Sequence, residues 1–204
     1  MQHRNSDTNP SAKRQTMKKN EIRMRVRARK SFLDDSERRN ASIKVFSMLE
    51  RMAAFMMAER VLAYSSLPDE LSTREFLDKW HGYKRIYLPR VNGVDLDILP
   101  YDRTRMHLGA FHIEEPDGED MADVSDMDIV IVPAVAYDSY GRRVGRGKGY
   151  YDRLLANVKA VTIGVAYDFQ LLDEDDCIED EPHDVSVDYV ITPTRFIKVR
   201  RQNR

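Results

Sequence analysis

Two short runs of apolar residues constrain the fold of this chain more than any other feature. Ile129–Val135 contains no polar side chain, and the only polar side chain in Val161–Ala166 is that of Thr162. Continuous apolar runs of this length are typical of strands buried on both faces of a parallel sheet. The segment Tyr151–Val158, which lies between them, is expected to be helical. Strands that alternate with helices predict an α/β fold with a mainly parallel sheet.

Two helices are expected before the first strand. The first begins near Lys18 and carries a narrow apolar stripe of Ile22, Val26 and Leu33. The second follows Asp34–Ser36, which supply N-cap chemistry. Its apolar face is expected to consist of Ile43, Phe46, Leu49, Ala53 and Met56.

A β-α-β unit is expected next. Its strands are Val61–Ser65 and Arg85–Pro89, and Ser72 or Thr73 can cap the helix between them. The apolar residues of that helix are Phe76, Leu77 and Trp80.

A hairpin and a last strand complete the expected sheet. Asn92-Gly93 is a turn signal between Ile86–Val91 and Val94–Leu99, and Tyr189–Thr192 is the last strand. The fold class predicted from these elements is a three-layer, Rossmann-like α/β fold. It has a mostly parallel sheet with helices on both faces, and the hairpin can form an antiparallel edge of that sheet.

The composition excludes several classes of protein. Of 204 residues, 33 are Lys or Arg and 34 are Asp or Glu, so the net charge near −1 argues against a globally basic nucleic-acid binder. Basic residues do gather locally, in Lys13–Lys30. No apolar stretch reaches the roughly 18 residues of a membrane span, and the single Cys177 cannot form an intramolecular disulfide. We therefore expect a cytoplasmic monomer without a membrane or a specific nucleic acid as partner.

The beginning of the chain differs from the rest. Residues 1–17 are polar and lack the apolar core of a secretory signal, so we expect them to be a disordered tail. Residues 18–204 are expected to form a single α/β domain.

A glycine-rich basic loop is the most informative segment for function. It follows the buried strand at Ile129–Val135, and it precedes the expected helix at Tyr151. Glycines here allow backbone N–H groups to approach an anion, while the helix N-terminus and the interleaved cations favour phosphate. A polyphosphate cradle is predicted, although neither a Walker motif nor a complete dinucleotide fingerprint is present. The alternative is a mobile basic surface loop. The residues concerned are Gly141, Arg142, Arg143, Gly145, Arg146, Gly147, Lys148 and Gly149.

The loop closely resembles a family signature. Gly141-x-Arg143-Val-Gly-Arg-Gly-Lys-Gly-Tyr-Tyr-Asp152 is similar to the signature of the 5-formyltetrahydrofolate cyclo-ligase family. The resemblance extends in order from about Lys18 to Thr192. Its other segments are Lys19-x-x-x-Arg23, Tyr64-Ser-Ser-Leu-Pro-Asp-Glu70 followed by Thr73, Leu88-Pro-Arg90, Gly109-x-Phe111-x-Ile-x-Glu-Pro116, Gly164-Val-Ala-Tyr-Asp-x-Gln170 and His183-Asp-Val-x-Val-Asp188.

The resemblance implies an activity and its co-substrates. Members of this family couple ATP hydrolysis to the cyclisation of 5-formyltetrahydrofolate into 5,10-methenyltetrahydrofolate, giving ADP and phosphate. ATP would phosphorylate the formyl oxygen, and N10 of the folate would close the ring. The implied small-molecule partners are the folate and ATP, with Mg²⁺ as the metal.

The resemblance also implies roles for individual residues. Arg146 and Lys148 are expected to be catalytic. The expected ATP-binding residues are Lys19, Arg23, Arg143, Gly145, Arg146, Gly147, Lys148, Gly149, Tyr150 and Tyr151. The expected folate-binding residues are Ser65, Glu70, Phe111, Arg146, Gly147, Lys148, Gly149 and Tyr150. Asp152 and Asp184 are the expected Mg²⁺ ligands, because Mg²⁺ prefers hard oxygen donors.

Several other basic residues and one histidine are not expected to bind a ligand directly. Arg25, Arg27, Arg29 and Lys30 are expected to form a solvated face of the first helix. His183 is expected to support the site rather than to act as a base.

Two other functions remain open from the residues themselves. A nucleic-acid-associated protein would use the basic arm Lys13–Lys30, and its binding would weaken steeply with salt. A sugar-phosphate isomerase-like α/β enzyme would not need ATP.

Overall fold

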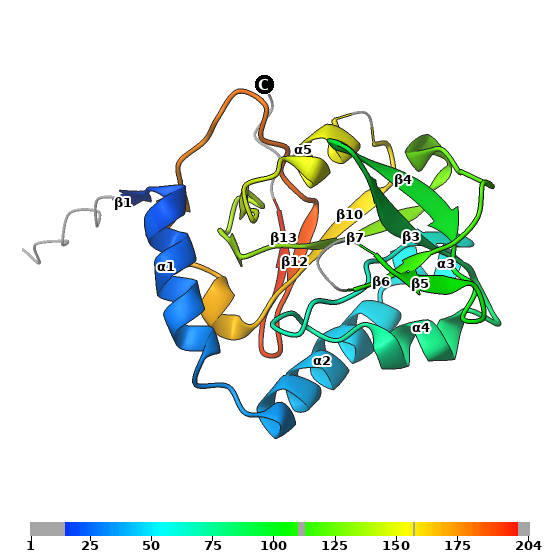
Figure 1. Cartoon of the computed structure of the whole chain (residues 1–204). Helices are drawn as coiled ribbons and strands as arrows, with labels where there is room; N and C mark the ends of the chain where they lie inside the picture. The colour runs from blue at the N-terminus through cyan, green and yellow to red at the C-terminus, as the bar shows by residue number, and fades with distance from the viewer. Residues whose placement is uncertain (1–14, 110–112, 157, 200–204) are drawn as a thin grey trace, which may run out of the picture.

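A seven-stranded sheet organises the chain (Figure 1). The computed structural model describes residues 15–109, 113–156 and 158–199. The five central strands are parallel, and one antiparallel strand is added at each edge. In spatial order the strands are β13 (Phe196–Lys198), β12 (Tyr189–Ile191), β10 (Val161–Val165), β7 (Ile129–Pro133), β2 (Arg60–Leu62), β3 (Arg85–Asn92) and β4 (Asp95–Pro100). The expected mixed α/β fold with a mostly parallel central sheet is confirmed.

The expected hairpin forms one edge of the sheet. Strands β3 and β4 pair antiparallel, and Asn92 faces Asp95 across the turn. Gly93 in that turn has a φ of 60°, which a residue with a side chain rarely adopts. At the other edge, β13 pairs antiparallel with β12, and the sequence analysis did not anticipate this strand.

Strand β7 is buried on both faces, as its apolar sequence predicted. Residues 129–132 are fully inaccessible to solvent, and alternate side chains enter different core clusters. Ile129 and Ile131 pack with residues of α2 (Asp35–Glu50), α3 (Ala53–Met57) and α4 (Arg74–Trp80). Val130 and Val132 pack with Leu155 of α5 (Tyr150–Leu155). Figure 1 shows α2 and α4 on one side of the sheet and α5 on the other.

The expected apolar face of the second helix is partly wrong. Asp34 does cap α2, accepting a hydrogen bond from the Glu37 N–H at 2.7 Å. However, Ile43 and Met56 are 46% and 63% exposed. The helix ends at Glu50 and a separate short helix follows, so a single 3.6-residue period cannot extend across both. The buried residues of α2 are Ser42, Val45, Phe46 and Leu49.

The first helix packs beside the glycine loop. Helix α1 (Lys19–Lys30) buries Ile22 and Val26, which contact a third cluster that includes Val144 of the short strand β9 (Arg143–Val144). Strand β9 pairs with β8 (Ala136–Tyr137). The core therefore holds α1 against the segment that enters the glycine loop.

The boundary expected for the N-terminal tail needs correction. Strand β1 (Gln15–Met17) pairs parallel with β11 (Asp176–Ile178), and Met17 is buried. Burial of an apolar side chain and strand pairing explain why these three residues belong to the domain. The expected disorder of residues 1–14 lies outside the described residues.

One more small sheet lies near the hairpin edge. It pairs β5 (Met106–Leu108) with β6 (Glu114–Pro116) in antiparallel register. Within the described ranges, no helix is long and apolar enough to cross a membrane.

Candidate functional site

A cavity of about 230 Å³ lies at the carboxyl ends of β2 and β7. Ligands of parallel α/β proteins commonly bind at this edge of the sheet. The cavity is smaller than the roughly 300–1,000 Å³ of typical ligand pockets, so it can enclose a flat ring but not two whole ligands. Its residues come from the segment after β2, the β3–β4 hairpin, β6, the glycine loop and α5. They include Tyr64, Ser65, Leu67, Glu70, Pro89, Val91, Leu96, Ile113, Glu115, Arg143, Gly145, Arg146, Lys148, Gly149, Tyr150, Tyr151 and Asp152.

Three positions of the glycine loop have a backbone that favours glycine. Gly141, Gly147 and Gly149 have φ values of 74°, 97° and 70°, in the left-handed region. Gly149 is also the N-cap of α5, which has only six residues, so its dipole adds less than expected. Between the glycines, Arg146 and Lys148 are exposed. The loop therefore presents cations to solvent at the mouth of the cavity.

Arg23 holds the loop from α1. Its Nε donates a hydrogen bond to the Gly145 carbonyl at 2.9 Å. Arg23 and Gly147 do not line the cavity, but they are close to each other, because a Cβ atom on Gly147 would lie 3.9 Å from the Arg23 guanidinium.

Arg143 connects the loop to two other segments. Its buried guanidinium donates to Asp152 Oδ1 at 2.5 Å and to the Val185 carbonyl. The side chain of Asp152 is 26% exposed and lines the cavity. Asp184 is adjacent to Val185 in the chain, which brings the segment that carries Asp184 to the back of the site.

Lys19 and Asp184 form an ion pair. The Lys19 ammonium lies 2.7 Å from Asp184 Oδ2 and 2.8 Å from Glu181 Oε2. Burial opposes the charged ammonium, but the hydrogen bonds and charges of both acids outweigh this and raise the pKa of Lys19. Neither Lys19 nor Asp184 lines the cavity.

Arg146 is held by two acids of the segment after β2. Its guanidinium lies 2.5 Å from Asp69 Oδ1 and 3.1 Å from Glu70 Oε1. Partial burial opposes the charge of Arg146, but Glu70 and Asp69 outweigh it and raise the pKa of this guanidinium. Glu70 also accepts a hydrogen bond from the Leu67 N–H at 3.1 Å. The loop after β2 and the glycine loop thus meet across the cavity.

Lys30 corrects an expectation of the sequence analysis. Its side chain is 9% exposed and its ammonium lies 3.0 Å from Asp69 Oδ2, so it is not part of a solvated face. Burial lowers the pKa of Lys30 despite this contact. Arg25, Arg27 and Arg29 are exposed, as expected.

The structure brings together most of the predicted site residues. Ten of them line the cavity: Ser65, Glu70, Arg143, Gly145, Arg146, Lys148, Gly149, Tyr150, Tyr151 and Asp152. Phe111 lies outside the described residues. In the described part of the chain, no three His, Cys, Asp or Glu residues form a ready cluster for a metal. Asp152 and Asp184 are each paired with a cation instead.

Two acids of the site were missed by the sequence analysis. Asp69 pairs with Arg146 and Lys30, and its position next to Glu70 was the only available signal. Glu115 lines the cavity from β6 and is 4% exposed. It belongs to the Gly109–Pro116 segment of the resemblance, but no single-residue pattern marked it as functional.

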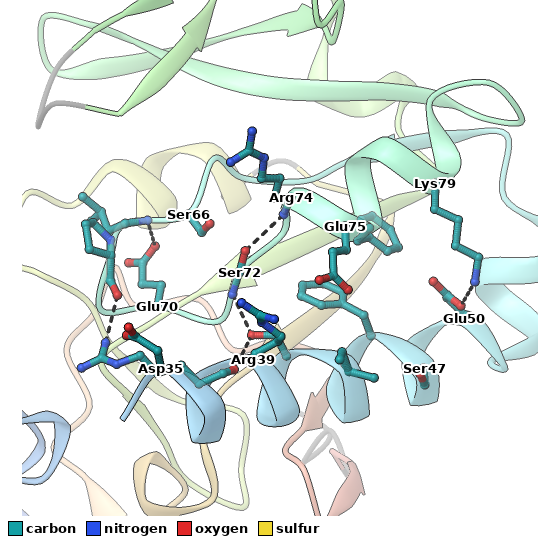
Figure 2. Close-up of a pocket in the computed structure, with 17 residues that line it drawn as sticks. Asp35, Arg39, Ser47, Glu50, Ser66, Glu70, Ser72, Arg74, Glu75 and Lys79 are labelled. Carbon is teal, nitrogen blue, oxygen red and sulfur yellow. Dashed lines mark hydrogen bonds and ion pairs between the residues drawn. The ribbon is translucent and has the colours of Figure 1, made fainter. Parts of the chain in front are cut away.

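A larger cavity, of about 560 Å³, lies between α2 and α4 (Figure 2). Some of its polar groups bind one another. Glu50 pairs with Lys79, and the Ser42 hydroxyl accepts a hydrogen bond from the Ser72 N–H at 2.9 Å. It shares only Leu67 and Glu70 with the smaller cavity. The smaller cavity is the candidate site because it contains the glycine loop.

Comparisons with known proteins agree on one family. The model of the 5-formyltetrahydrofolate cyclo-ligase family matches residues 15–193. A 5-formyltetrahydrofolate cyclo-ligase of Escherichia coli K12 is 29% identical over 180 residues, which cover 83% of this chain and 97% of that protein.

Two solved structures have the same fold. The NMR structure of Aquifex aeolicus 5,10-methenyltetrahydrofolate synthetase is 33% identical with a TM-score of 0.77, covering 91% of this chain and 94% of that one. A 5,10-methenyltetrahydrofolate synthetase from Mycoplasma pneumoniae is 22% identical with a TM-score of 0.67, covering 86% and 98%, and supports the fold alone.

Proposed function

The chain belongs to the 5-formyltetrahydrofolate cyclo-ligase family, and from this membership we infer its reaction. It is an enzyme that cyclises 5-formyltetrahydrofolate to 5,10-methenyltetrahydrofolate and converts ATP to ADP and phosphate. The observation that carries this function is that the basic glycine loop and Glu70 line one cavity.

In this reaction the protein mainly positions the two substrates and neutralises charge on the phosphoryl group. The formyl oxygen is a poor leaving group, so it attacks the γ-phosphorus of ATP and ADP departs. N10 of the folate then attacks the activated carbon and loses its proton, and the carbon–oxygen bond breaks to release phosphate. Such phosphoryl transfer is accelerated by groups that neutralise charge on the phosphoryl oxygens. Arg146 and Lys148 suit this role because both are exposed on the loop at the mouth of the cavity.

We assign the ATP phosphates to the loop and the cations behind it. Lys19, Arg23, Arg143, Arg146 and Lys148 supply the positive charge, and the glycines let the backbone approach. Lys19, Arg143 and Arg146 each hold a carboxylate in the structure. Phosphate oxygens would replace those carboxylates, so ATP binding exchanges existing ion pairs for new ones.

We assign the flat pterin ring to the enclosed part of the cavity. Leu67, Val91, Leu96 and Ile113 line it with apolar surface. Tyr150 offers an aromatic ring at the rim, and its hydroxyl donates a hydrogen bond to the Gly93 carbonyl at 3.3 Å. Glu70 would accept hydrogen bonds from the ring, with Ser65 beside it.

We also propose Mg²⁺ as the metal of this reaction. Mg²⁺ usually takes only one or two protein carboxylates beside nucleotide phosphates, and it would neutralise phosphate charge when bound. Asp152 fits this chemistry, because it lines the cavity and is partly exposed. Both oxygens of Asp184 accept hydrogen bonds from Lys19, so Asp184 becomes available only when Lys19 turns to a phosphate.

The fold type, the location in the cell and the oligomeric state are also proposals. We interpret the sheet with its two core clusters as a three-layer, Rossmann-like domain of a cytoplasmic monomer that acts without a membrane or a specific nucleic acid.

An absorbance assay tests the function. The full chain is mixed with 5-formyltetrahydrofolate, ATP and Mg²⁺, and methenyltetrahydrofolate is followed. We expect product only when ATP is present, and a loss of turnover in excess chelator. Absence of product under all conditions would contradict the proposed reaction, and turnover that persists in chelator would contradict the metal.

A Glu70→Gln variant tests the placement of the two ligands. It should weaken folate binding by about 10- to 150-fold, the equivalent of one charge-assisted hydrogen bond, and change ATP binding little. Calorimetric titration with each ligand separately measures this. Loss of ATP binding with intact folate binding would reverse the two subsites.

A further inference from the structure

Glu115 is a buried acid on the wall of the cavity that the proposed chemistry has not used. It lies in β6, which pairs with β5, and its side chain faces the cavity with 4% exposure. Its neighbour Glu114 is exposed, as alternation along a strand requires.

The carboxylate of Glu115 has few partners for a buried charge. It accepts one long hydrogen bond, 3.4 Å from the Val91 N–H, and makes no ion pair with any residue that the structure describes. Glu70 differs, because Arg146 and the Leu67 N–H already occupy its oxygens. A buried carboxylate is costly unless N–H or O–H groups satisfy it. Glu115 therefore has more unused capacity to accept hydrogen bonds than Glu70.

The chain keeps space for this carboxylate. A Cβ atom on Gly109 would lie 2.2 Å from Glu115 Oε2, well inside van der Waals contact. The Gly109 N–H donates to the Ile113 carbonyl at 2.8 Å, which fixes the glycine opposite β6. Any side chain at position 109 would displace the Glu115 carboxylate.

We propose that Glu115 is a further substrate-binding residue, which accepts hydrogen bonds from the amino and ring N–H groups of the pterin. This inference rests on the proposed function, because it takes the folate as the ligand of the cavity. The surrounding apolar residues would pack against the faces of the pterin ring, and the Glu115 carboxylate would bind its polar edge. Gly109 is then a positioning residue that acts through Glu115.

The first test compares Glu115→Gln with a matched control. Gln keeps the size of the side chain and removes its charge, and Glu114→Gln makes the same change on the exposed face of β6. We expect Glu115→Gln to weaken binding of 5-formyltetrahydrofolate by roughly 10- to 150-fold, with ATP affinity unchanged. Glu114→Gln should bind both ligands like the parent. Titration calorimetry with each ligand separates the two affinities, and KM for the folate should rise far more than KM for ATP.

The second test displaces the Glu115 carboxylate by a substitution at Gly109. Gly109→Ala should weaken folate binding in the parent chain, because its methyl group displaces Glu115. In a Glu115→Ala background, the same substitution should add little, since the displaced group is gone. This double-mutant cycle measures the coupling between positions 109 and 115.

The outcomes separate this inference from the proposed function. If the parent chain forms methenyltetrahydrofolate but Glu115→Gln binds folate as tightly, the role of Glu115 is wrong and the function stands. Additive effects of the two alanine substitutions would also overturn the coupling through Gly109. If the parent chain neither binds nor cyclises the folate, the function itself fails.

Discussion

Two cations of the candidate site, Lys19 and Arg146, are paired with acids from distant parts of the chain. Lys19 and Asp184 are separated by 165 residues, and Arg146 and Glu70 by 76. Residue types and the family resemblance predicted which of these side chains belong to the site. The pairing could not be predicted, because nothing local in the sequence specifies contacts over such separations.

Lys148 is the site cation whose substitution gives the clearest result. It is exposed and makes no ion pair with the described residues, so Lys148→Ala should leave the thermal midpoint unchanged. Loss of its phosphate contact should weaken ATP binding by about 10- to 150-fold and reduce turnover. Titration with ATP measures the affinity. Lys44→Ala, an exposed lysine of α2, is the control, and equal effects of the two substitutions would contradict the assignment.

Substitution of Asp152 should lower both the stability of the protein and its turnover. Asp152→Asn leaves the buried guanidinium of Arg143 without its carboxylate, and a buried charge that loses its partner is costly. We expect a loss of about 1–3 kcal/mol in unfolding free energy together with a large fall in turnover. Urea unfolding measures the first effect and the absorbance assay the second. An unchanged turnover would restrict Asp152 to a structural role.

At the scale of elements, local signals predicted the large features and missed the small ones. The Asn92-Gly93 turn and the apolar run of β7 each specify their own geometry, and both predictions are confirmed. The break between α2 and α3 and the pairing of β1 with β11 depend on tertiary contacts. Strands of two or three residues carry too little periodicity to be predicted.

The glycine loop offers a prediction about backbone geometry. Gly141 has a φ of 74°, and a Cβ there would lie 2.5 Å from the Val187 carbonyl oxygen. Gly141→Ala should therefore cost more than about 1–2 kcal/mol, the penalty of the left-handed conformation alone. Gly145→Ala is the control, because nothing lies within 4 Å of its Cβ position. Urea unfolding compares them, and equal stability of the two variants would contradict the strain.

Strand β1 makes the extent of the N-terminal tail testable. Deletion of residues 1–14 should leave the thermal midpoint and turnover nearly unchanged, as we expect for a segment outside the domain. Deletion of residues 1–17 should lower the midpoint, because it removes the pairing with β11 and the buried Met17. Calorimetry of the two truncations measures the difference. Equal midpoints would show that β1 contributes nothing to the domain.

At the scale of the whole molecule, one charge network joins three segments around the site. Lys30 of α1, Asp69 of the segment after β2, and Arg146 of the glycine loop are in contact. A ligand that draws Arg146 away from Asp69 would change all three together. The network therefore joins α1, the segment after β2 and the glycine loop, which carry the proposed folate and phosphate subsites.

The same network predicts how stability depends on pH. Burial opposes ionisation of Asp69, but the hydrogen bonds and charges of Lys30 and Arg146 outweigh it and lower its pKa from 3.8. A lowered folded pKa contributes stability that is fully present above pH 3.8 and is lost as the pH falls through the folded value.

Asp69→Asn should remove this pH-dependent part of the stability. The variant should be less stable than the parent chain at pH 7, and the difference should shrink as the pH falls below about 4. Urea unfolding at pH 7 and at several values below 4 measures it, with Asp120→Asn, an exposed acid, as the control. A difference that stays constant across this range would mean that Asp69 acts through packing, and the network would then carry no electrostatic link between the two sides of the cavity.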